Sequence, residues 1–299
     1  MFMNRSHQAL FTHLEARYRV EKELGRGNMG VVYLAVDQRL ERWVAIKTLS
    51  PSKLPEDGQR DELIQRFHRE ARMLARISHP NLVTVFEAGH HDDEHYMVME
   101  YIEGSPLSRF IQARQKLSHT LVASLGKQLC DALQRIHQEG IIHRDVKPDN
   151  MILSPQGQVK LADFGVALMP QSAEQLRLTQ AGALMGSLIY CAPEQIHNAL
   201  TVDARADIYA LGVSLYELLA QFTPYQSQHL VQLTAEITSP QSHGGRLRDR
   251  APELPDTLVQ IIEKALAKAP EDRYQSAEAM GEAFNHFMQI HLFHKKISN

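Results

Sequence analysis

Two short strings in the middle of the chain carry the residues best suited to phosphoryl chemistry. HRDVKPDN occupies residues 143–150, and DFG begins at Asp163. The carboxylate of Asp145 suits accepting a proton from a hydroxyl, and that of Asp163 suits holding Mg²⁺ against phosphates. Lys147 would offset the charge of a transferring phosphoryl group, and Asn150 offers a neutral metal ligand. Each acidic residue alone could form a turn, but so many in one string predict an active site.

A glycine-rich run lies near the N-terminus. In ELGRGNMGVVYLAVD, Gly25, Gly27 and Gly30 have G-x-G-x-x-G spacing. A dinucleotide-binding fingerprint would open a helix, but the β-branched Val31 and Val32 follow. A Walker A loop is excluded because no Gly-Lys-Ser/Thr follows. The pattern predicts a hairpin whose backbone N–H groups approach a triphosphate, and a plain glycine hairpin is the alternative.

A lysine and a glutamate on separate elements form a candidate ion pair. Lys47 ends the strand-like string WVAIK, and Glu70 lies in the amphipathic string QRFHREARMLARI. Glu70 would point inward between Phe67 and Leu74, where a lone carboxylate is costly unless it is paired. We expect Lys47 to pair with it and to contact the α- and β-phosphates of a nucleotide. Solvated, unpaired side chains are the alternative.

The bulk properties are those of an ordinary globular protein. The 299 residues can form more than one domain, and the net charge of −3 gives no support to a nucleic-acid partner. Cys130 and Cys191 have no metal or redox spacing, so we expect reduced, buried thiols in a cytoplasmic protein. No apolar run approaches the length of a membrane span, and the start of the chain does not resemble a signal peptide.

Hydrophobic periodicity predicts an α+β protein with two lobes. The first third reads as strands with one helix that begins near Asp61. The expected strands are Tyr18–Leu24, Val31–Asp37, Trp43–Leu49, Leu82–Gly89 and Tyr96–Tyr101, the last two joined by a polar turn at 90–95. The remainder is mainly helical. Its expected elements are a helix with a stripe from Leu121 to Ile136, strands Met151–Leu153 and Val159–Ala162, a buried helix Ala206–Ala220, and helices at 256–268 and 276–290.

The chain resembles the protein kinases, most of all the bacterial eukaryotic-like (Hanks-type) serine/threonine kinases. The resemblance runs from Tyr18 to Phe287 and includes VAIK, HRDVKPDN, DFG, YCAPEQ and KAPEDRYQSAEAM. It implies a bilobal fold with a small antiparallel-sheet N-lobe and a larger helical C-lobe. It also implies ATP with Mg²⁺, or Mn²⁺ instead, and transfer to Ser or Thr of protein substrates. The expected parts are a helical or loose extension at 1–17, a kinase domain at 18–290 divided into lobes 18–102 and 103–290, and a polar tail at 291–299.

The resemblance also implies a nucleotide site, residue by residue. Val32 and Ala45 would cover the adenine from one side and Ile152 from the other, with Met99 as gatekeeper. The hinge would use the carbonyl of Glu100 and the N–H of Ile102. The complete expected nucleotide set is Leu24, Gly25, Gly27, Gly30, Val32, Ala45, Lys47, Glu70, Met99, Glu100, Ile102 and Ile152. Asp145 and Lys147 would be catalytic, and Asn150 and Asp163 would hold the metal.

Further residues gain expected roles from the same resemblance. Asp207 would anchor the catalytic loop, Glu194 would pair with Arg273, and Ser187 would bridge Asp145 and Lys147. Leu74, His143 and Phe164 would stack as a regulatory spine. Because Arg144 in the family awaits a phosphate, we expect autophosphorylation of Thr179, with an ordinary loop residue as the alternative.

Two other classes of protein are alternatives to an active protein kinase. A non-enzymatic pseudokinase would lack one or more of the catalytic residues, and a small-molecule kinase of the choline or aminoglycoside type would lack the APE segment and Arg273. We expect His90, His91 and His95 to be solvated rather than a metal site. Relatives form homodimers, but no residue here predicts one.

Overall fold

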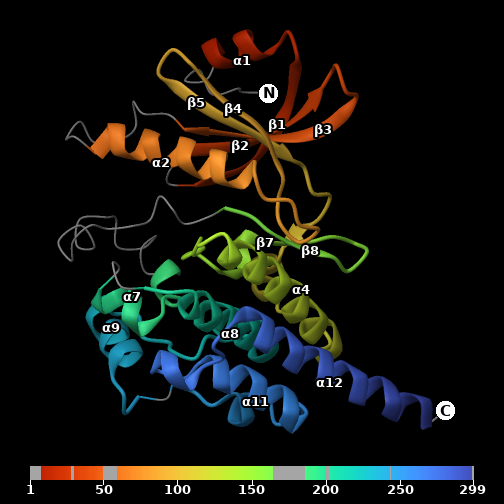
Figure 1. The fold of residues 1–299 in the computed structure, drawn as a ribbon, viewed down its shortest axis with the longest axis vertical. Helices are drawn as coiled ribbons and strands as arrows, with labels where there is room; N and C mark the ends of the chain where they lie inside the picture. The colour runs from red at the N-terminus through yellow and green to blue at the C-terminus, as the bar shows by residue number, and fades with distance from the viewer. Residues whose placement is uncertain are drawn as a thin grey trace. The chain divides into compact units, whose positions relative to one another are not determined.

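The computed structural model describes residues 8–27, 30–49, 59–163, 186–198, 202–242 and 244–297. The chain divides into two compact units, and each is described by itself. The first comprises Met1–His79 and Val83–Ile102, and the second comprises Pro80–Leu82 and Glu103–Asn299. The first is built on a sheet and the second on helices (Figure 1), as the periodicity predicts.

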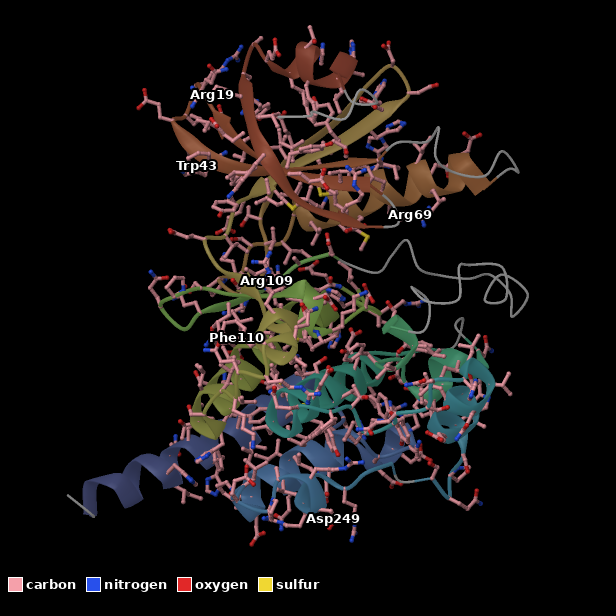
Figure 2. The ribbon with its side chains drawn as sticks, turned by 180° about the vertical axis from the view of Figure 1, so that it is seen from behind. Arg19, Trp43, Arg69, Arg109, Phe110 and Asp249 are labelled. Atoms are coloured by element: carbon pink, nitrogen blue, oxygen red, sulfur yellow. The ribbon has the colours of Figure 1, made fainter. Side chains whose placement is uncertain are left out.

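The first unit contains a five-stranded antiparallel sheet in the order β1-β2-β3-β5-β4. Its strands are β1 (Tyr18–Gly27), β2 (Gly30–Asp37), β3 (Arg42–Leu49), β4 (Val85–His91) and β5 (Glu94–Glu100). The one long helix among the described residues of this unit, α2 (Gln59–Leu74), packs on β4 and buries Phe67, Glu70, Ala71 and Leu74. Trp43 at the start of β3 is half exposed (Figure 2).

The register of the sheet separates its two faces. Val32 pairs with Lys47 and Ala45 pairs with Met99, and Ala45 and Lys47 are two residues apart on β3. Because paired residues and alternate residues share a face, these four side chains belong to one face. Val44, Ile46 and their neighbours belong to the other. The strand register therefore places the residues expected to contact adenine and phosphate, which lie on β2, β3 and β5, on the same side of the sheet.

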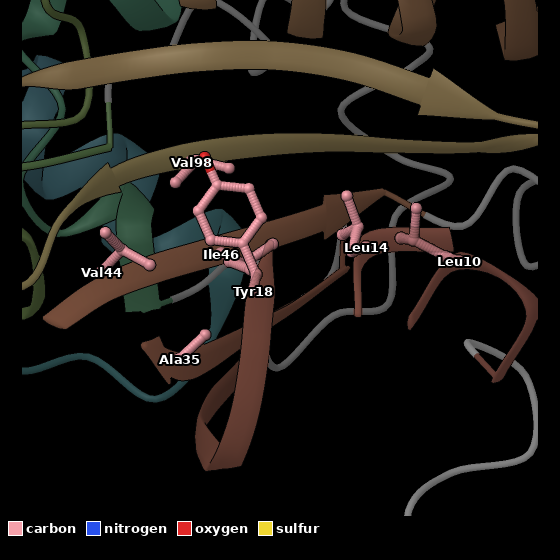
Figure 3. Packing of buried hydrophobic residues seen from close by; sticks show 7 residues of the cluster. All are labelled: Leu10, Leu14, Tyr18, Ala35, Val44, Ile46 and Val98. Carbon is pink, nitrogen blue, oxygen red and sulfur yellow. The ribbon is translucent and has the colours of Figure 1, made fainter. Parts of the chain in front are cut away.

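The opposite face is covered by the helix α1 (Gln8–Leu14), which the sequence left as helical or loose. Leu10 and Leu14 lie one turn apart and pack with Tyr18 into a buried cluster (Figure 3). The sheet residues of that cluster are Ala35, Val44, Ile46 and Val98. Phe11 is also buried and meets the Tyr33 ring edge-on at 4.7 Å. The helix is thus part of the core of the first unit.

The β4–β5 hairpin corrects two expectations. The expected turn at 90–95 is too long, because β4 runs to His91 and β5 begins at Glu94. A two-residue turn suffices, since Asp92 adopts the left-handed conformation (φ 50°) that such turns require. His95 is consequently in a strand, and its Nδ1 lies 2.8 Å from Nε2 of His68 rather than in solvent. Among the described residues, no three His, Cys, Asp or Glu side chains form a metal site.

The second unit is built around α8 (Arg205–Ala220), which is buried almost throughout, as its apolar sequence predicts. Figure 1 shows α4 (His119–Gln138), α11 (Asp256–Ala265) and α12 (Ala277–Ile297) beside it. The shorter helices are α3 (Leu107–Gln112), α7 (Pro193–His197), α9 (Leu230–Thr238) and α10 (Leu247–Arg250), with 3₁₀ turns at Pro148–Asn150 and Pro270–Asp272. Three short strands, β6 (Ser105–Pro106), β7 (Met151–Leu153) and β8 (Val159–Leu161), form a second sheet.

Three further details of this unit bear on the expectations. The last helix continues to Ile297, so most of the expected polar tail is helical. Cys130 is fully buried, whereas Cys191 is only partly buried, and neither is in a disulfide. The thiol of Cys191 is itself shielded, and burial raises its pKa to about 12. No helix within the described ranges is long and apolar enough to cross a membrane.

Candidate active site

Asp207 of α8 fixes the backbone of the predicted catalytic loop. Its two carboxylate oxygens accept hydrogen bonds from the backbone N–H groups of His143 and Arg144, both at 2.8 Å. The Asp207 side chain is completely buried, so these bonds act in a medium of low dielectric. They help hold Arg144 in the left-handed conformation (φ 68°), which is strained for a residue with a side chain. The expected anchoring role of Asp207 is confirmed.

His143 connects this loop to the residue before Asp163. Its Nδ1 must accept from the backbone N–H of Asp145 (3.3 Å), so Nε2 carries the hydrogen and donates to the carbonyl of Ala162 (3.2 Å). The imidazole is therefore neutral. Burial lowers the pKa of His143 despite the opposing effect of Asp207 and Asp145. A protonated ring would lose its bond to the Asp145 backbone.

A pH dependence of stability follows from His143. Because its folded pKa lies below the unfolded value of 6.5, the unfolded chain takes up the proton first. The contribution of His143 to the free energy of unfolding is therefore complete above pH 6.5, and it is lost as the pH falls towards and through the folded pKa. In urea titrations between about pH 5 and 7, we expect His143→Phe, which cannot titrate, to lose less stability on acidification than the wild type. Parallel curves for the two proteins would contradict this assignment.

Asp145, Lys147 and Ser187 form a hydrogen-bonded cluster in the second unit. Lys147 Nζ lies 2.8 Å from each carboxylate oxygen of Asp145 and donates to the Ser187 hydroxyl at 3.0 Å. Both charged side chains are mostly buried. This corrects the expected bridge, because the Lys147 ammonium group, and not the Ser187 hydroxyl, contacts both of the other two side chains. A hydroxyl substrate would meet a carboxylate whose orientation is already fixed.

Asn150 completes the cluster. Its Nδ2 donates to Oδ2 of Asp145 at 2.9 Å, to the Asp145 carbonyl at 2.8 Å and to the Asp163 carbonyl at 3.3 Å. Because the amide nitrogen makes these bonds, the amide oxygen faces away from them. The backbone of Asp163 is strained in the left-handed region (φ 51°). The structure thus brings Asp145, Lys147, Asn150 and Asp163 together on one unit, as predicted.

The donor set fits a magnesium ion that is shared with phosphates. An amide oxygen from Asn150 and a carboxylate from Asp163 are hard ligands of the kind Mg²⁺ prefers. The protein would supply only these two, because Mg²⁺ in such sites keeps water and phosphate oxygens as its other ligands.

Arg273 and Glu194 form the predicted ion pair in a bidentate geometry. Arg273 NH1 and NH2 donate to the two carboxylate oxygens at 2.6 and 2.8 Å. The remaining donors reach the carbonyls of Ala267, Arg205 and Lys268 at 2.7–3.1 Å. All five N–H groups of a completely buried guanidinium are therefore satisfied. The pair fastens the segment after Ser187 to the end of the domain.

The first unit carries the other predicted nucleotide residues. Glu70 is buried at 3% exposure, and Lys47 is half buried. Ala45 and Met99 pair across β3 and β5, on the same sheet face as Lys47. Gly30 is required structurally, because a Cβ there would overlap the carbonyl oxygen of Thr48. The remaining residues of the set keep their predicted roles without a direct test. They are Leu24, Gly25, Gly27, Val32, Glu100 and Ile102 in this unit and Ile152 on β7.

Some predicted residues lie outside the described ranges. These are Phe164 of the predicted spine and Thr179 of the predicted phosphorylation site. Conversely, sequence reasoning missed His137 on α4. Its Nε2 lies 2.7 Å from Asp207 Oδ2, so it takes part in anchoring the loop. His137 directly follows Ile136 and lies four residues after Leu133, both of which belong to the buried apolar stripe of α4. This spacing was the sequence signal that could have identified the side chain of His137 as buried.

Comparison with known proteins identifies the family. The family model for the protein kinase domain matches residues 18–285. The chain belongs to the protein kinase family, and the resemblance drawn from its motifs is confirmed. The helix α1 precedes the matched range.

The relatives are bacterial serine/threonine kinases. The chain is 35% identical to serine/threonine-protein kinase PrkC of Bacillus subtilis over 267 residues, which are 89% of the chain and 40% of PrkC. It is 37% identical to PknB of Mycobacterium leprae over 279 residues, 90% of the chain and 42% of PknB. The chain thus spans less than half the length of these relatives. Among solved structures, Rad53 1-466 in complex with AMP-PNP matches 92% of this chain and 66% of its own, with a TM-score of 0.72 and 25% identity.

Proposed function

We propose that this protein is a serine/threonine kinase that transfers the γ-phosphoryl group of ATP to Ser and Thr hydroxyls of proteins. The observation that carries the proposal is the Asp145–Lys147–Ser187 cluster on a loop anchored by Asp207. The similarity to the serine/threonine-protein kinases PrkC and PknB supports the choice of acceptor. A pseudokinase scaffold would not need this set of oriented polar side chains.

Each residue of the cluster has a distinct role in the proposed reaction. Asp145 accepts the hydrogen bond and then the proton of the acceptor hydroxyl. Lys147, held on Asp145 and Ser187, offsets the negative charge that spreads over the phosphoryl oxygens. Asn150 holds the Asp145 carboxylate through its Nδ2 and offers its oxygen to Mg²⁺ together with Asp163. Bound Mg²⁺, or Mn²⁺ in its place, neutralises phosphate charge.

The first unit supplies the proposed nucleotide contacts. Lys47, paired with Glu70, contacts the α- and β-phosphates, and the glycines of the β1–β2 hairpin bring backbone N–H groups close to them. The adenine rests on Val32 and Ala45 and is read by the hinge residues Glu100 and Ile102. That Val32, Ala45, Lys47 and Met99 share one sheet face supports this assignment.

Two further parts of the proposal concern regulation and location. We propose autophosphorylation at Thr179, with Arg144 as the residue that binds the phosphate. The unpaired thiols of Cys130 and Cys191 support a reducing, cytoplasmic site of action.

Variants in the two units test the proposal together. We expect wild-type protein with Mg²⁺ and γ-labelled ATP to label a generic basic protein acceptor. Lys47→Met and Asp163→Asn should each lower that labelling by roughly two to four orders of magnitude, because each removes charge that positions or neutralises the phosphates. Far-UV circular dichroism should show that both variants stay folded. Full labelling by either variant would contradict the role assigned to that residue.

A further inference from the structure

An exposed phenylalanine in the second unit lies between two arginines. Phe222 follows the end of α8 and is 42% exposed. The guanidinium carbons of Arg114 and Arg250 lie 4.9 and 5.7 Å from its ring centroid. Arg114 NH1 also donates to the Gln221 carbonyl at 3.3 Å. The ring and both cations are thus held at the surface in a defined arrangement.

These arginines lack acidic partners within the described part of the chain. No described carboxylate lies within ion-pair distance of Arg114, Arg250 or the nearby Arg246, whereas Arg248 pairs with Asp256. Apart from the bond between Arg114 NH1 and the Gln221 carbonyl, the surface therefore presents guanidinium groups that no described carboxylate of the protein neutralises. Planar guanidinium groups bind carboxylates in a bidentate manner.

Two hollows that share lining residues form a depression along this surface. One hollow of about 480 Å³ is lined by Gly186, Ile189 and Phe222, and another of about 530 Å³ is lined by Gly244 and Arg250. The two hollows share Tyr225, Gln226 and Ser227. Gly186 directly precedes Ser187, whose hydroxyl bonds to Lys147. One end of the depression therefore lies next in sequence to a member of the catalytic cluster.

The charge changes along the depression. Its near end contains Glu217, which already accepts a hydrogen bond from the Tyr190 hydroxyl at 2.5 Å. Glu236 farther along accepts from Gln232 at 3.0 Å. At the far end, Arg246 and Arg250 line the surface with Asp249, which is exposed (Figure 2). Cations therefore exceed acids at the far end, and Arg114 adds a further cation beside Phe222, which lines the first hollow.

We propose that Arg114, Phe222, Arg246 and Arg250 form a docking surface for an acidic segment of the protein substrate. Asp and Glu side chains on one side of the phosphorylated residue would bind the guanidinium groups, and their aliphatic parts would pack on the Phe222 ring. The inference deepens the proposed function, on which it rests, by naming the charge of the substrate. Because the contacts lie away from the reacting groups, they lower KM and leave kcat unchanged.

Peptides of one acceptor sequence test the surface. Each carries four Glu, four Gln or four Lys residues, placed before or after a central Ser. For wild type we expect one Glu peptide to have a KM about five- to ten-fold below that of its Gln counterpart at low salt, which is the gain expected from two exposed ion pairs. The double variant Arg114→Gln/Arg250→Gln should lose this preference. Lys127→Gln/Arg135→Gln on α4 removes the same charge elsewhere and should retain it.

A binding measurement separates this inference from the proposed activity. Fluorescence anisotropy of the labelled Glu peptides needs no phosphoryl transfer, and we expect the double variant to bind the preferred one about five- to ten-fold more weakly than the wild type. Binding preference without any transfer would contradict the kinase activity but support the surface. Equal binding of Glu and Gln peptides by the wild type, or an acidic preference that survives in the double variant, would overturn the surface.

Discussion

Replacing Asp145 with asparagine is expected to lower kcat for phosphoryl transfer by roughly 10²- to 10⁴-fold, the range for loss of a positioned general base. In the structure Lys147 Nζ and Asn150 Nδ2 both donate to the Asp145 carboxylate. An amide presents one oxygen to these two donors and cannot take the proton of the acceptor hydroxyl. Steady-state kinetics with saturating ATP and protein acceptor measures the effect.

The neighbouring aspartate provides the matched control. Asp149 lies in the same loop but is exposed, so Asp149→Asn should leave kcat within about two- to three-fold of the wild type, as expected for a surface change of under ~0.5 kcal/mol. The KM for ATP should change little in Asp145→Asn, because the role proposed for this residue is to take the proton of the acceptor hydroxyl. An Asp145→Asn protein that retains wild-type kcat would remove this residue from the chemistry.

Replacing Arg273 with methionine is expected to destabilise the second unit by about 3–5 kcal/mol. The buried guanidinium donates to Glu194 and to three carbonyl groups, and methionine would remove all of these bonds. Its aliphatic side chain fills similar space, so the loss is one of hydrogen bonds and charge. Urea denaturation, followed by circular dichroism of the helices, gives the free energy of unfolding.

An exposed pair beside it serves as the comparison. Arg205 pairs with Asp203 at 2.7 Å, but both side chains are partly exposed. Arg205→Gln should therefore cost no more than about 1 kcal/mol. Similar losses in Arg205→Gln and Arg273→Met would show that burial of the Glu194 pair adds nothing to its importance.

Local pattern was sufficient for much of the fold. The β-branched runs of β2 and β3 and the stripe of α4 predicted elements that agree with the structure within a few residues. The β4–β5 turn was placed too broadly because His90, His91 and His95 are polar, and polarity does not distinguish a turn from an exposed strand. The histidines pair across the strands instead, His90 with His95.

Tertiary packing decided the elements that pattern left open. The segment before Tyr18 gives a weak signal, with Leu10, Phe11 and Leu14 among polar residues. These three residues become buried only because the sheet offers an apolar face to cover. Short elements such as β6 and α3 also escape prediction, since a two-residue strand has no periodicity.

The candidate site was predictable to the level of residues but not of contacts. The sequence named Asp145, Lys147, Asn150 and Asp207. The structure joins the first three by hydrogen bonds and joins Asp207 to the backbone of His143 and Arg144. The orientation of the Asn150 amide and the tautomer of His143 depend on partners far along the chain, such as the Asp163 and Ala162 carbonyls. Sequence spacing carries no information about such angles.

Phosphoamino-acid analysis of a labelled acceptor tests the central claim most directly. Wild-type protein is incubated with Mg²⁺, γ-labelled ATP and a protein acceptor, and the acceptor is then hydrolysed and its labelled amino acids are separated. We predict label in phosphoserine and phosphothreonine, and none above background with Asp145→Asn. Label in phosphotyrosine alone, no label with the wild type, or equal label with the variant would contradict the assignment of this site to serine and threonine phosphorylation.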